Sequence, residues 1–280
     1  MRGRWRYLRT IGHGELTMQR VWEAAARRVR HLPHWIAWQL PGGGGAPARA
    51  RLAAYRDRHA GEQCLIVANG PSIRGMDLAL ARGMVVIGMN RGYRLRETHG
   101  IDLTYLVAID VASQIRYVAR EIAAAPVLAR FVNWNGRRYF RPDENVEYLR
   151  MTFRPGFYGD VTSGVYGGHS VTYACLQLAF HMGFARVILI GKDHSYAESG
   201  TPTKVVVATG REDNHFIGGY YRPGEVWRIP DYKGEEMAYR WAQDAFRRAG
   251  REVLDATVGG RLNVFPKADF LDAMAKRSGP

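Results

Sequence analysis

Short apolar runs rich in valine, isoleucine and leucine alternate with longer amphipathic stretches from residue 64 onward. This alternation is typical of parallel strands joined by crossover helices. The apolar runs predict strands at 64–68, 84–89, 103–109, 127–132, 146–151, 186–190 and 252–255. The amphipathic stretches predict helices at 112–124, 165–182, 234–249 and 267–276. The sequence therefore predicts an α/β fold with a mostly parallel sheet flanked by helices.

The first 58 residues are strongly basic. They hold twelve arginines and three acidic residues, in a chain whose net charge is +14. The aromatic residues interleaved with these arginines are Trp5, Tyr7, Trp22, Trp35 and Trp38. Arginine with tryptophan is the composition of a helix that lies on anionic lipid, although a solvated helical arm or a nucleic-acid contact would also be basic. Since no zinc-finger or RNP-like motif occurs, we expect a basic helical arm, an anionic membrane surface as its partner through residues 1–40, and no nucleic acid.

A linker with four consecutive glycines, Pro41–Pro47, follows this arm. Such a run is costly to hold in a regular element, so we expect a boundary there, with 1–58 as arm and linker and 59–280 as one α/β domain.

Cys64 and Cys175 lie in apolar runs far apart, which predicts buried free thiols in a reducing compartment. No apolar run approaches the roughly 20 residues of a spanning helix. We therefore expect a cytoplasmic protein, peripheral on the inner face of the cell membrane.

Polar or glycine-rich residues follow three of the predicted strands. They are Asn69, Gly70, Pro71 and Ser72 after the first, Asn90 after the second and Asp110 after the third. Ligands of open parallel sheets bind beyond the carboxyl ends of the strands, and a glycine turn lets backbone N–H groups approach a phosphate. Each residue alone is equally explained as a turn residue or a helix cap. Their shared edge favours a nucleotide site.

Two further motifs carry candidate chemistry. Thr162, Ser163 and Gly164 precede the predicted helix 165–182, where a helix N-terminus would bind an anion, or where Ser163 would simply be the N-cap. Lys192, Asp193 and His194 directly follow the apolar run 186–190. Charged groups are costly in a core and favourable in a crevice at the end of a strand, so we expect them to line the site.

Residues 196–232 are polar, glycine-rich and aromatic without periodicity, which predicts a functional loop that covers the substrate as a lid. Within it, His215 could take a proton from an acceptor hydroxyl, and Tyr220 and Tyr221 could stack on a sugar or bind a phosphate. The alternative is that His215 is a structural histidine that holds the loop in place.

No P-loop, GxGxxG, GxSxG, HExxH or paired-acid DxD motif occurs, so the sequence indicates no catalytic metal and no resident cofactor.

Together these motifs resemble the bacterial sialyltransferases of glycosyltransferase family 42. The segments that carry the resemblance are IVANGPSI (66–73), GMN (88–90), TSGVY (162–166), RVILIGKDHSY (186–196) and NHFIGGYY (214–221). They resemble still more closely the broader group known as domain of unknown function 115, or 6-hydroxymethylpterin pyrophosphokinase-like. The resemblance covers about 64–265. It implies a GT-A-like, Rossmann-like domain that is metal-independent and takes a CMP-activated sugar as co-substrate.

The resemblance also implies roles for single residues. The phosphate region of the nucleotide would be contacted by Asn69, Gly70 and Ser72, and the nucleotide or the nearby sugar by Asn90. The phosphate or the donor's carboxylate would be held by Thr162, Ser163 and Gly164. Asp193 would lie by the ribose or cytosine. The chain departs from the sialyltransferases at two places, with Asp160 and Val161 where they carry an arginine before TSG, and Gly219 where they carry a second histidine. The role of base therefore falls to His215.

Three functions remain open from the sequence. The first is a transferase that moves a sialic-acid-like sugar, nonulosonic or other, from CMP to a glycan or glycolipid acceptor of the cell surface. The second is an ATP-dependent pyrophosphokinase acting on a hydroxymethyl pterin, with Asp110, Asp193 and Asp213 as candidate Mg²⁺ ligands. The third is a non-catalytic nucleotide-binding protein. A homo-oligomer is compatible with each of them.

Overall fold

The computed structural model describes residues 18–141, 145–197, 200–211 and 213–275. The start of the predicted arm, with Trp5 and Tyr7, lies outside the described residues. The chain divides into two compact units, 1–47 and 48–280, and each is described by itself. No described helix is both long and apolar enough to cross a membrane.

The described part of the first unit holds one long helix, α2 (Met18–Gln39), with Pro33 inside it. The helix ends in a glycine turn in which Gly42 and Gly44 have φ angles of +79° and +88°. The next helix, α3 (Gly45–Ala53), starts directly after this turn. The predicted linker is therefore a turn between two helices.

The second unit starts earlier than the predicted domain limit at residue 59 because α3 and the turns after it pack on the sheet. Leu52 is fully buried, and its carbonyl oxygen accepts a hydrogen bond from His181 Nε2 at 3.0 Å. The Tyr55 ring meets Phe131 edge to face at a centroid distance of 5.0 Å. Residues 48–58 therefore belong to the α/β domain rather than to the arm.

The central sheet has seven strands in the order β11-β8-β1-β2-β3-β4-β5, and every neighbouring pair is parallel. The strands are β1 (Gln63–Val67), β2 (Val85–Met89), β3 (Tyr105–Ala108), β4 (Ala129–Asn133), β5 (Val146–Leu149), β8 (Arg186–Ile190) and β11 (Glu252–Asp255). Each coincides with a predicted strand. The Rossmann-like α/β fold is thus confirmed.

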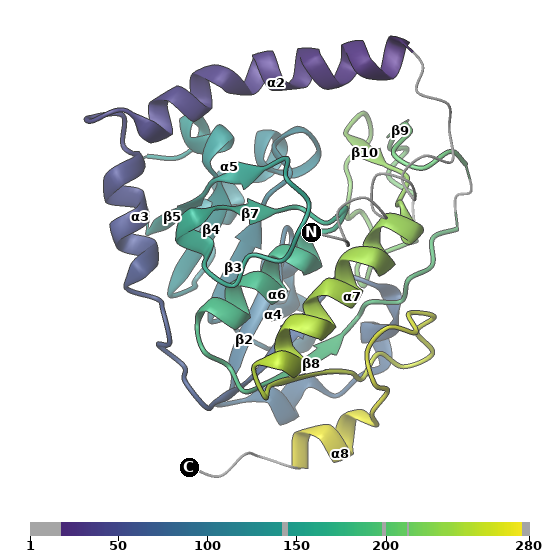
Figure 1. The fold of residues 1–280 in the computed structure, drawn as a ribbon. Helices are drawn as coiled ribbons and strands as arrows, with labels where there is room; N and C mark the ends of the chain where they lie inside the picture. The colour runs from purple at the N-terminus through teal and green to yellow at the C-terminus, as the bar shows by residue number, and fades with distance from the viewer. Residues whose placement is uncertain (1–17, 142–144, 198–199, 212, 276–280) are drawn as a thin grey trace. The chain divides into compact units, whose positions relative to one another are not determined.

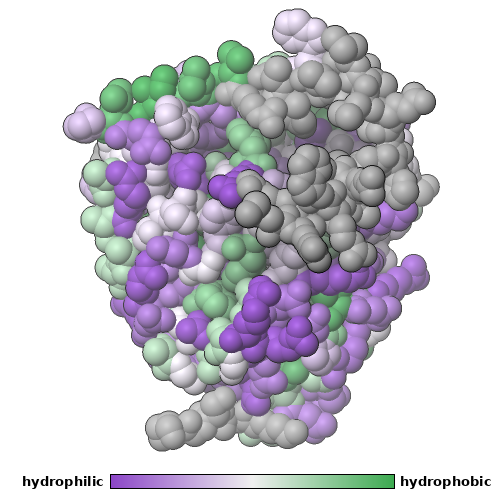
Figure 2. Space-filling model, viewed as in Figure 1, coloured by the Kyte–Doolittle hydropathy of each residue, from purple (hydrophilic) through white to green (hydrophobic). Residues whose placement is uncertain are grey.

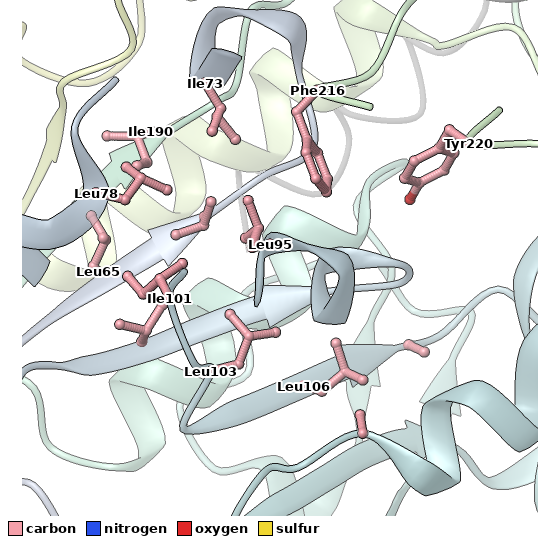
Figure 3. Close-up of a cluster of buried hydrophobic side chains, with 14 of the residues drawn as sticks. Leu65, Ile73, Leu78, Leu95, Ile101, Leu103, Leu106, Ile190, Phe216 and Tyr220 are labelled. Carbon is pink, nitrogen blue, oxygen red and sulfur yellow. The ribbon is translucent and has the colours of Figure 1, made fainter. Parts of the chain in front are cut away.

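The strands are buried on both faces, as parallel sheets require. Leu65 and Val67 of β1 join a cluster on one face, while Cys64 and Ile66 point to the other. Figure 3 shows the first cluster, where Leu65, Leu106 and Ile190 from three strands meet side chains of the connecting segments. Both cysteines are buried and free, as predicted.

Short helices connect the strands on the side of this cluster. They are η1 (Pro71–Gly75), η2 (Leu78–Ala81), η3 (Gly92–Arg94), α4 (Leu95–His99), a π-helical turn η4 (Val111–Ile115), α5 (Arg116–Ala124) and η5 (Trp134–Tyr139). The longer helices α6 (Val171–His181) and α7 (Tyr232–Arg248) lie side by side across the sheet (Figure 1). The last described helix is α8 (Phe270–Ala275). All four predicted helices exist.

The predicted start of the helix at 165 is wrong, because α6 begins at Val171. Val165 and Tyr166 form a short strand, β7, that pairs with β6 (Met151–Thr152). A glycine pair follows, and Ser170 then caps the helix by accepting a hydrogen bond from the backbone N–H of Thr172. Thr162, Ser163 and Gly164 therefore do not open α6; Val161–Ser163 form a separate 3₁₀ turn, η6.

The segment 196–232 is more regular than predicted. It contains an antiparallel ribbon of β9 (Val205–Val207) and β10 (Val226–Arg228). Several of its aromatic and aliphatic side chains are buried in the domain's core, among them Trp227. Phe216 and Tyr220 are two others (Figure 3). Burial of large apolar side chains fixes the segment as a wall of the domain.

Candidate functional site

A cavity of about 400 Å³ opens at the carboxyl ends of β8, β1, β2 and β3. Residues that follow each of these strands line it, namely Lys192, Asn69, Asn90 and Asp110. At about 4.8 Å per strand, the four strand ends extend over roughly 14 Å. The volume and the place in the fold are those of a small-molecule site.

Unusual backbone conformations gather at this cavity. Five described non-glycine residues have φ between +51° and +67°, and four of them, Asn90, His169, His194 and Thr203, line the cavity. Positive φ is uncommon outside glycine, and such strained positions cluster at functional sites. The strain therefore marks the same place as the strand ends.

The turn after β1 is held by Asp193. Its two carboxylate oxygens accept hydrogen bonds from the Ser72 N–H at 3.0 Å and the Ser72 hydroxyl at 2.8 Å. A Cβ on Gly70 would lie 1.8 Å from Asp193 Oδ2, so only glycine fits there. Gly70 and Asp193 line the cavity, whereas Pro71 and Ser72 do not. Asp193 thus fastens the β1 turn to the end of β8.

A group of ionisable side chains lies next to Asp193. Lys192 Nζ is 2.7 Å from Glu235 Oε2, and both side chains are nearly buried. Burial lowers the pKa of Lys192, but the Glu235 carboxylate outweighs that effect and raises it; burial raises the pKa of Glu235, and Lys192 lowers it further than that. His194 lies 3.4 Å from Glu235 and 3.3 Å from Glu236. Lys192 is therefore held charged at the β8 end of the cavity.

His169 lies at the start of α6, immediately before the Ser170 cap. Its Nδ1 is 3.1 Å from Asp231 Oδ2, and both side chains are about one-quarter exposed. A carboxylate on one ring nitrogen fixes the tautomer and orientation of a histidine and leaves the other nitrogen for proton exchange. His169, Ser170 and Asp231 all line the cavity.

The aromatic wall of the cavity comes from the segment 213–225. The buried Arg91 guanidinium pairs with Glu225 and donates to the carbonyl oxygen of Tyr220. The His215 ring stacks on Tyr220 at a centroid distance of 3.7 Å, and its side chain is almost fully buried. Burial raises the pKa of Tyr220 and of Tyr221 well above the usual range. His215, Tyr220 and Tyr221 line the cavity as a rigid surface.

Three buried amide oxygens at the cavity have no hydrogen-bond partner within the described residues: Asn69 Oδ1, Asn90 Oδ1 and Gln114 Oε1. The amide nitrogen of Asn69 donates to the Tyr220 hydroxyl at 3.0 Å, and that of Gln114 donates to the Tyr221 hydroxyl at 2.9 Å. Buried polar atoms in native structures are rarely left unpaired. These acceptors therefore call for a ligand that carries several hydrogen-bond donors.

Thr162, Ser163 and Gly164 lie away from the cavity. Asp160 accepts hydrogen bonds from Thr162 and sits 3.7 Å from His181, at the C-terminal end of α6. Eleven helical residues span about 16 Å, and the cavity is at the other end of this helix. The motif Thr162-Ser163-Gly164 is therefore a structural turn. The residues that stand at the N-terminal end of α6, where this motif was expected, are His169 and Ser170.

The three candidate magnesium ligands do not come together. Asp110 accepts the N–H groups of Ala112 and Ser113 as a helix cap, Asp193 is bound by Ser72, and Asp213 pairs with Arg74. Among the residues that the structure describes, no group of three His, Cys, Asp or Glu side chains could hold a metal ion.

Several lining residues were missed by sequence reasoning: Gln114, His169, Ser170, Asp231 and Glu235. Ser170 had a readable signal, since a serine before the apolar run 171–179 is an N-cap pattern. Glu235 and Asp231 lie at the start of a predicted helix, where acidic residues are ordinary. The pairings of these acids with Lys192 and His169 had no local signal.

The fold and the cavity define an α/β protein with a cavity at the carboxyl edge of a parallel sheet. The chain belongs to the family described as 6-hydroxymethylpterin diphosphokinase MptE-like, which its residues 48–199 match. It is also similar to the solved MAf glycosyltransferase from Magnetospirillum magneticum AMB-1, with 16% identity and a TM-score of 0.48 over 79% of this chain. The similarity spans 38% of that protein's chain. No curated protein matches the sequence.

Proposed function

We propose that this protein is a glycosyltransferase that takes its sugar from a nucleotide-activated donor, with a CMP-linked nonulosonic sugar as the first donor to test. The observation that carries the proposal is the composition of the cavity, which joins Lys192, His194 and the N-terminal end of α6 to unpaired buried acceptors. A phosphate-linked sugar presents the complementary groups, an anion and several hydroxyls.

The anionic part of the donor would lie at the β8 side. Lys192 is held charged there, and the positive end of the α6 dipole and His194 face the same cavity. Such a group of fixed cationic and dipolar partners stabilises a phosphate as it leaves.

The donor-rich part of the ligand would lie at β1, β2 and β3. Asn69, Asn90 and Gln114 offer unpaired oxygens to sugar or ribose hydroxyls or to a base amino group. The stacked rings of His215 and Tyr220 form the adjoining wall. In this arrangement His215 is a positioning residue, because its ring is buried between aromatic neighbours.

The base in this proposal is His169. Its ring is partly exposed to the cavity and is oriented by Asp231. The acceptor oxygen would form a bond to the anomeric carbon as the bond from that carbon to the phosphate oxygen breaks. CMP would leave with the electron pair, and the acceptor proton would pass to His169 Nε2.

The test has two stages. Thermal unfolding is first measured with CMP, CDP, UDP, GDP and ATP, each with and without Mg²⁺, because a ligand at 100 times its Kd stabilises by about 2.7 kcal/mol. Release of CMP from a CMP-linked nonulosonic sugar is then measured for the wild type, H169Q and the control H99Q, whose ring contacts Ile73 outside the cavity. We expect stabilisation by CMP without metal, and a loss of CMP release of at least 100-fold in H169Q alone.

Stabilisation by ATP only in the presence of Mg²⁺ would instead indicate the pyrophosphokinase. Stabilisation by CMP without any release of CMP from donors would indicate a nucleotide-binding protein without turnover. Equal activity of H169Q and the wild type would refute the role of His169 while leaving the donor class intact.

A further inference from the structure

The helix α2 exposes an apolar stripe. Trp22, Val29, Leu32, Trp35 and Ile36 have exposed fractions between 40% and 70%. Positions 22, 29, 32 and 36 follow the spacing of seven, three and four residues that places side chains on one face of a helix. The hydrophobic residues toward the C-terminal half of α2 form the green band at the upper left of Figure 2.

This exposure is concentrated. Leu40, just beyond the helix, is 54% exposed and extends the stripe. Isolated exposed apolar side chains need no explanation, whereas a contiguous group on one helix marks a surface that another apolar phase covers. Trp38, about half a turn away from Trp22, Val29 and Ile36, is buried and does not belong to the stripe.

The charge of α2 indicates what kind of apolar surface covers the stripe. The α2 sequence holds four arginines, Arg20, Arg27, Arg28 and Arg30, and one acidic residue, Glu23. A helix with tryptophan and aliphatic residues on one face and many arginines lies in the plane of an anionic bilayer surface, with its apolar face among the acyl chains. At 22 residues, α2 would extend about 33 Å along that surface.

We infer that α2 docks this protein on an anionic lipid bilayer. Each arginine near such a surface contributes about 1 kcal/mol, or roughly fivefold in partitioning, and the apolar stripe supplies the part of the affinity that does not depend on lipid charge. The inference does not depend on the proposed function. Docking through α2 would place the protein on a membrane surface, where a lipid-linked acceptor would also lie.

Flotation of the full chain with vesicles tests this inference. One set of vesicles is phosphatidylcholine alone, and the other contains about one-third phosphatidylglycerol. The variant W22S/V29S/I36S removes three stripe residues, and the matched control L128S/V258S/L271S removes three apolar residues of the second unit that are 53–63% exposed. A third variant, R27S/R28S/R30S, removes charge.

We expect the wild type and the matched control to partition at least tenfold more strongly into the anionic vesicles. The stripe variant should lose at least tenfold in binding to them. The arginine variant should lose tenfold or more as well, and added salt should weaken binding of the wild type. The substituted stripe and control residues are solvent-exposed, so their substitution should change thermal unfolding little.

Three results would overturn the inference: no flotation with either vesicle, equal flotation with both, or equal loss in the stripe variant and its matched control. A fourth is concentration-dependent dimerisation that the stripe variant abolishes, which would assign the stripe to a second copy of the chain. Sedimentation velocity without lipid measures it.

Discussion

Replacing Glu235 by glutamine removes the negative partner of Lys192 while preserving the shape of the side chain. The two groups are 2.7 Å apart, with side-chain exposures of 11% for Lys192 and 5% for Glu235. At an effective dielectric constant of 20, their attraction is about 6 kcal/mol, and desolvation offsets much of it. Breaking one partner of a buried pair costs about 3–5 kcal/mol, because the other charge stays buried. We expect E235Q to lower the free energy of unfolding by that amount at pH 7.

The pH dependence follows from the two pKa shifts. The pKa of Glu235 is lowered from 4.5, so its stabilisation is complete above that pH and disappears as the pH falls through the folded-state value. The pKa of Lys192 is raised from 10.5, so its stabilisation is complete below that pH and is lost only as the pH rises through the folded-state value. The stabilisation that the pair gives the wild type should therefore be constant between about pH 5 and pH 10 and be lost in acid, so the difference from E235Q should shrink as the pH falls.

Urea unfolding from pH 3 to pH 9 measures this difference. E236Q is the matched control, because Glu236 is the next residue and its side chain is 36% exposed. The double variant K192M/E235L removes both charges and should recover much of the loss, since an apolar pair needs no compensation. A loss below 1 kcal/mol in E235Q, or a double variant as unstable as E235Q, would refute the argument.

Other substitutions test separate parts of the domain. G70A should destabilise by more than 2 kcal/mol in urea unfolding, because its Cβ would lie 1.8 Å from Asp193 Oδ2; an unchanged midpoint would contradict this packing. Y220F should cost about 1–2 kcal/mol, since Asn69 loses an acceptor at a buried site, and an effect below 0.5 kcal/mol would mean that water replaces the hydroxyl. R247A should change stability by less than 0.5 kcal/mol, because the side chain is 80% exposed and its ion pair with Asp244 is solvated.

The strands were predictable because their burial is local in sequence. Each strand of a covered parallel sheet is apolar on both faces, so a run such as 186–190 is legible without knowledge of its neighbours. The start of α6 was not predictable in the same way. Val165 and Tyr166 fit the helical pattern, but they pair with β6, and this competition is decided by a contact with residues 151–152.

The residues of the site also differ in how far they could be predicted from the local sequence. Asn69, Asn90 and Asp110 follow consecutive strands, so the rule for parallel sheets was enough to bring them to one cavity.

The pairings that give the cavity its chemistry join residues far apart in the chain. Arg91 and Glu225 are separated by 134 positions, and Lys192 and Glu235 by 43. In the sequence, neither partner of such a pair can be told from an ordinary surface charge, because only the fold buries both. The left-handed backbone conformation of His169 likewise has no signature in the neighbouring residues. Which residues follow the strands can thus be predicted from the local sequence. The charge state and orientation of their side chains are properties of the assembled domain. The choice between His169 and His215 as base therefore depends on burial and orientation, which only the fold supplies.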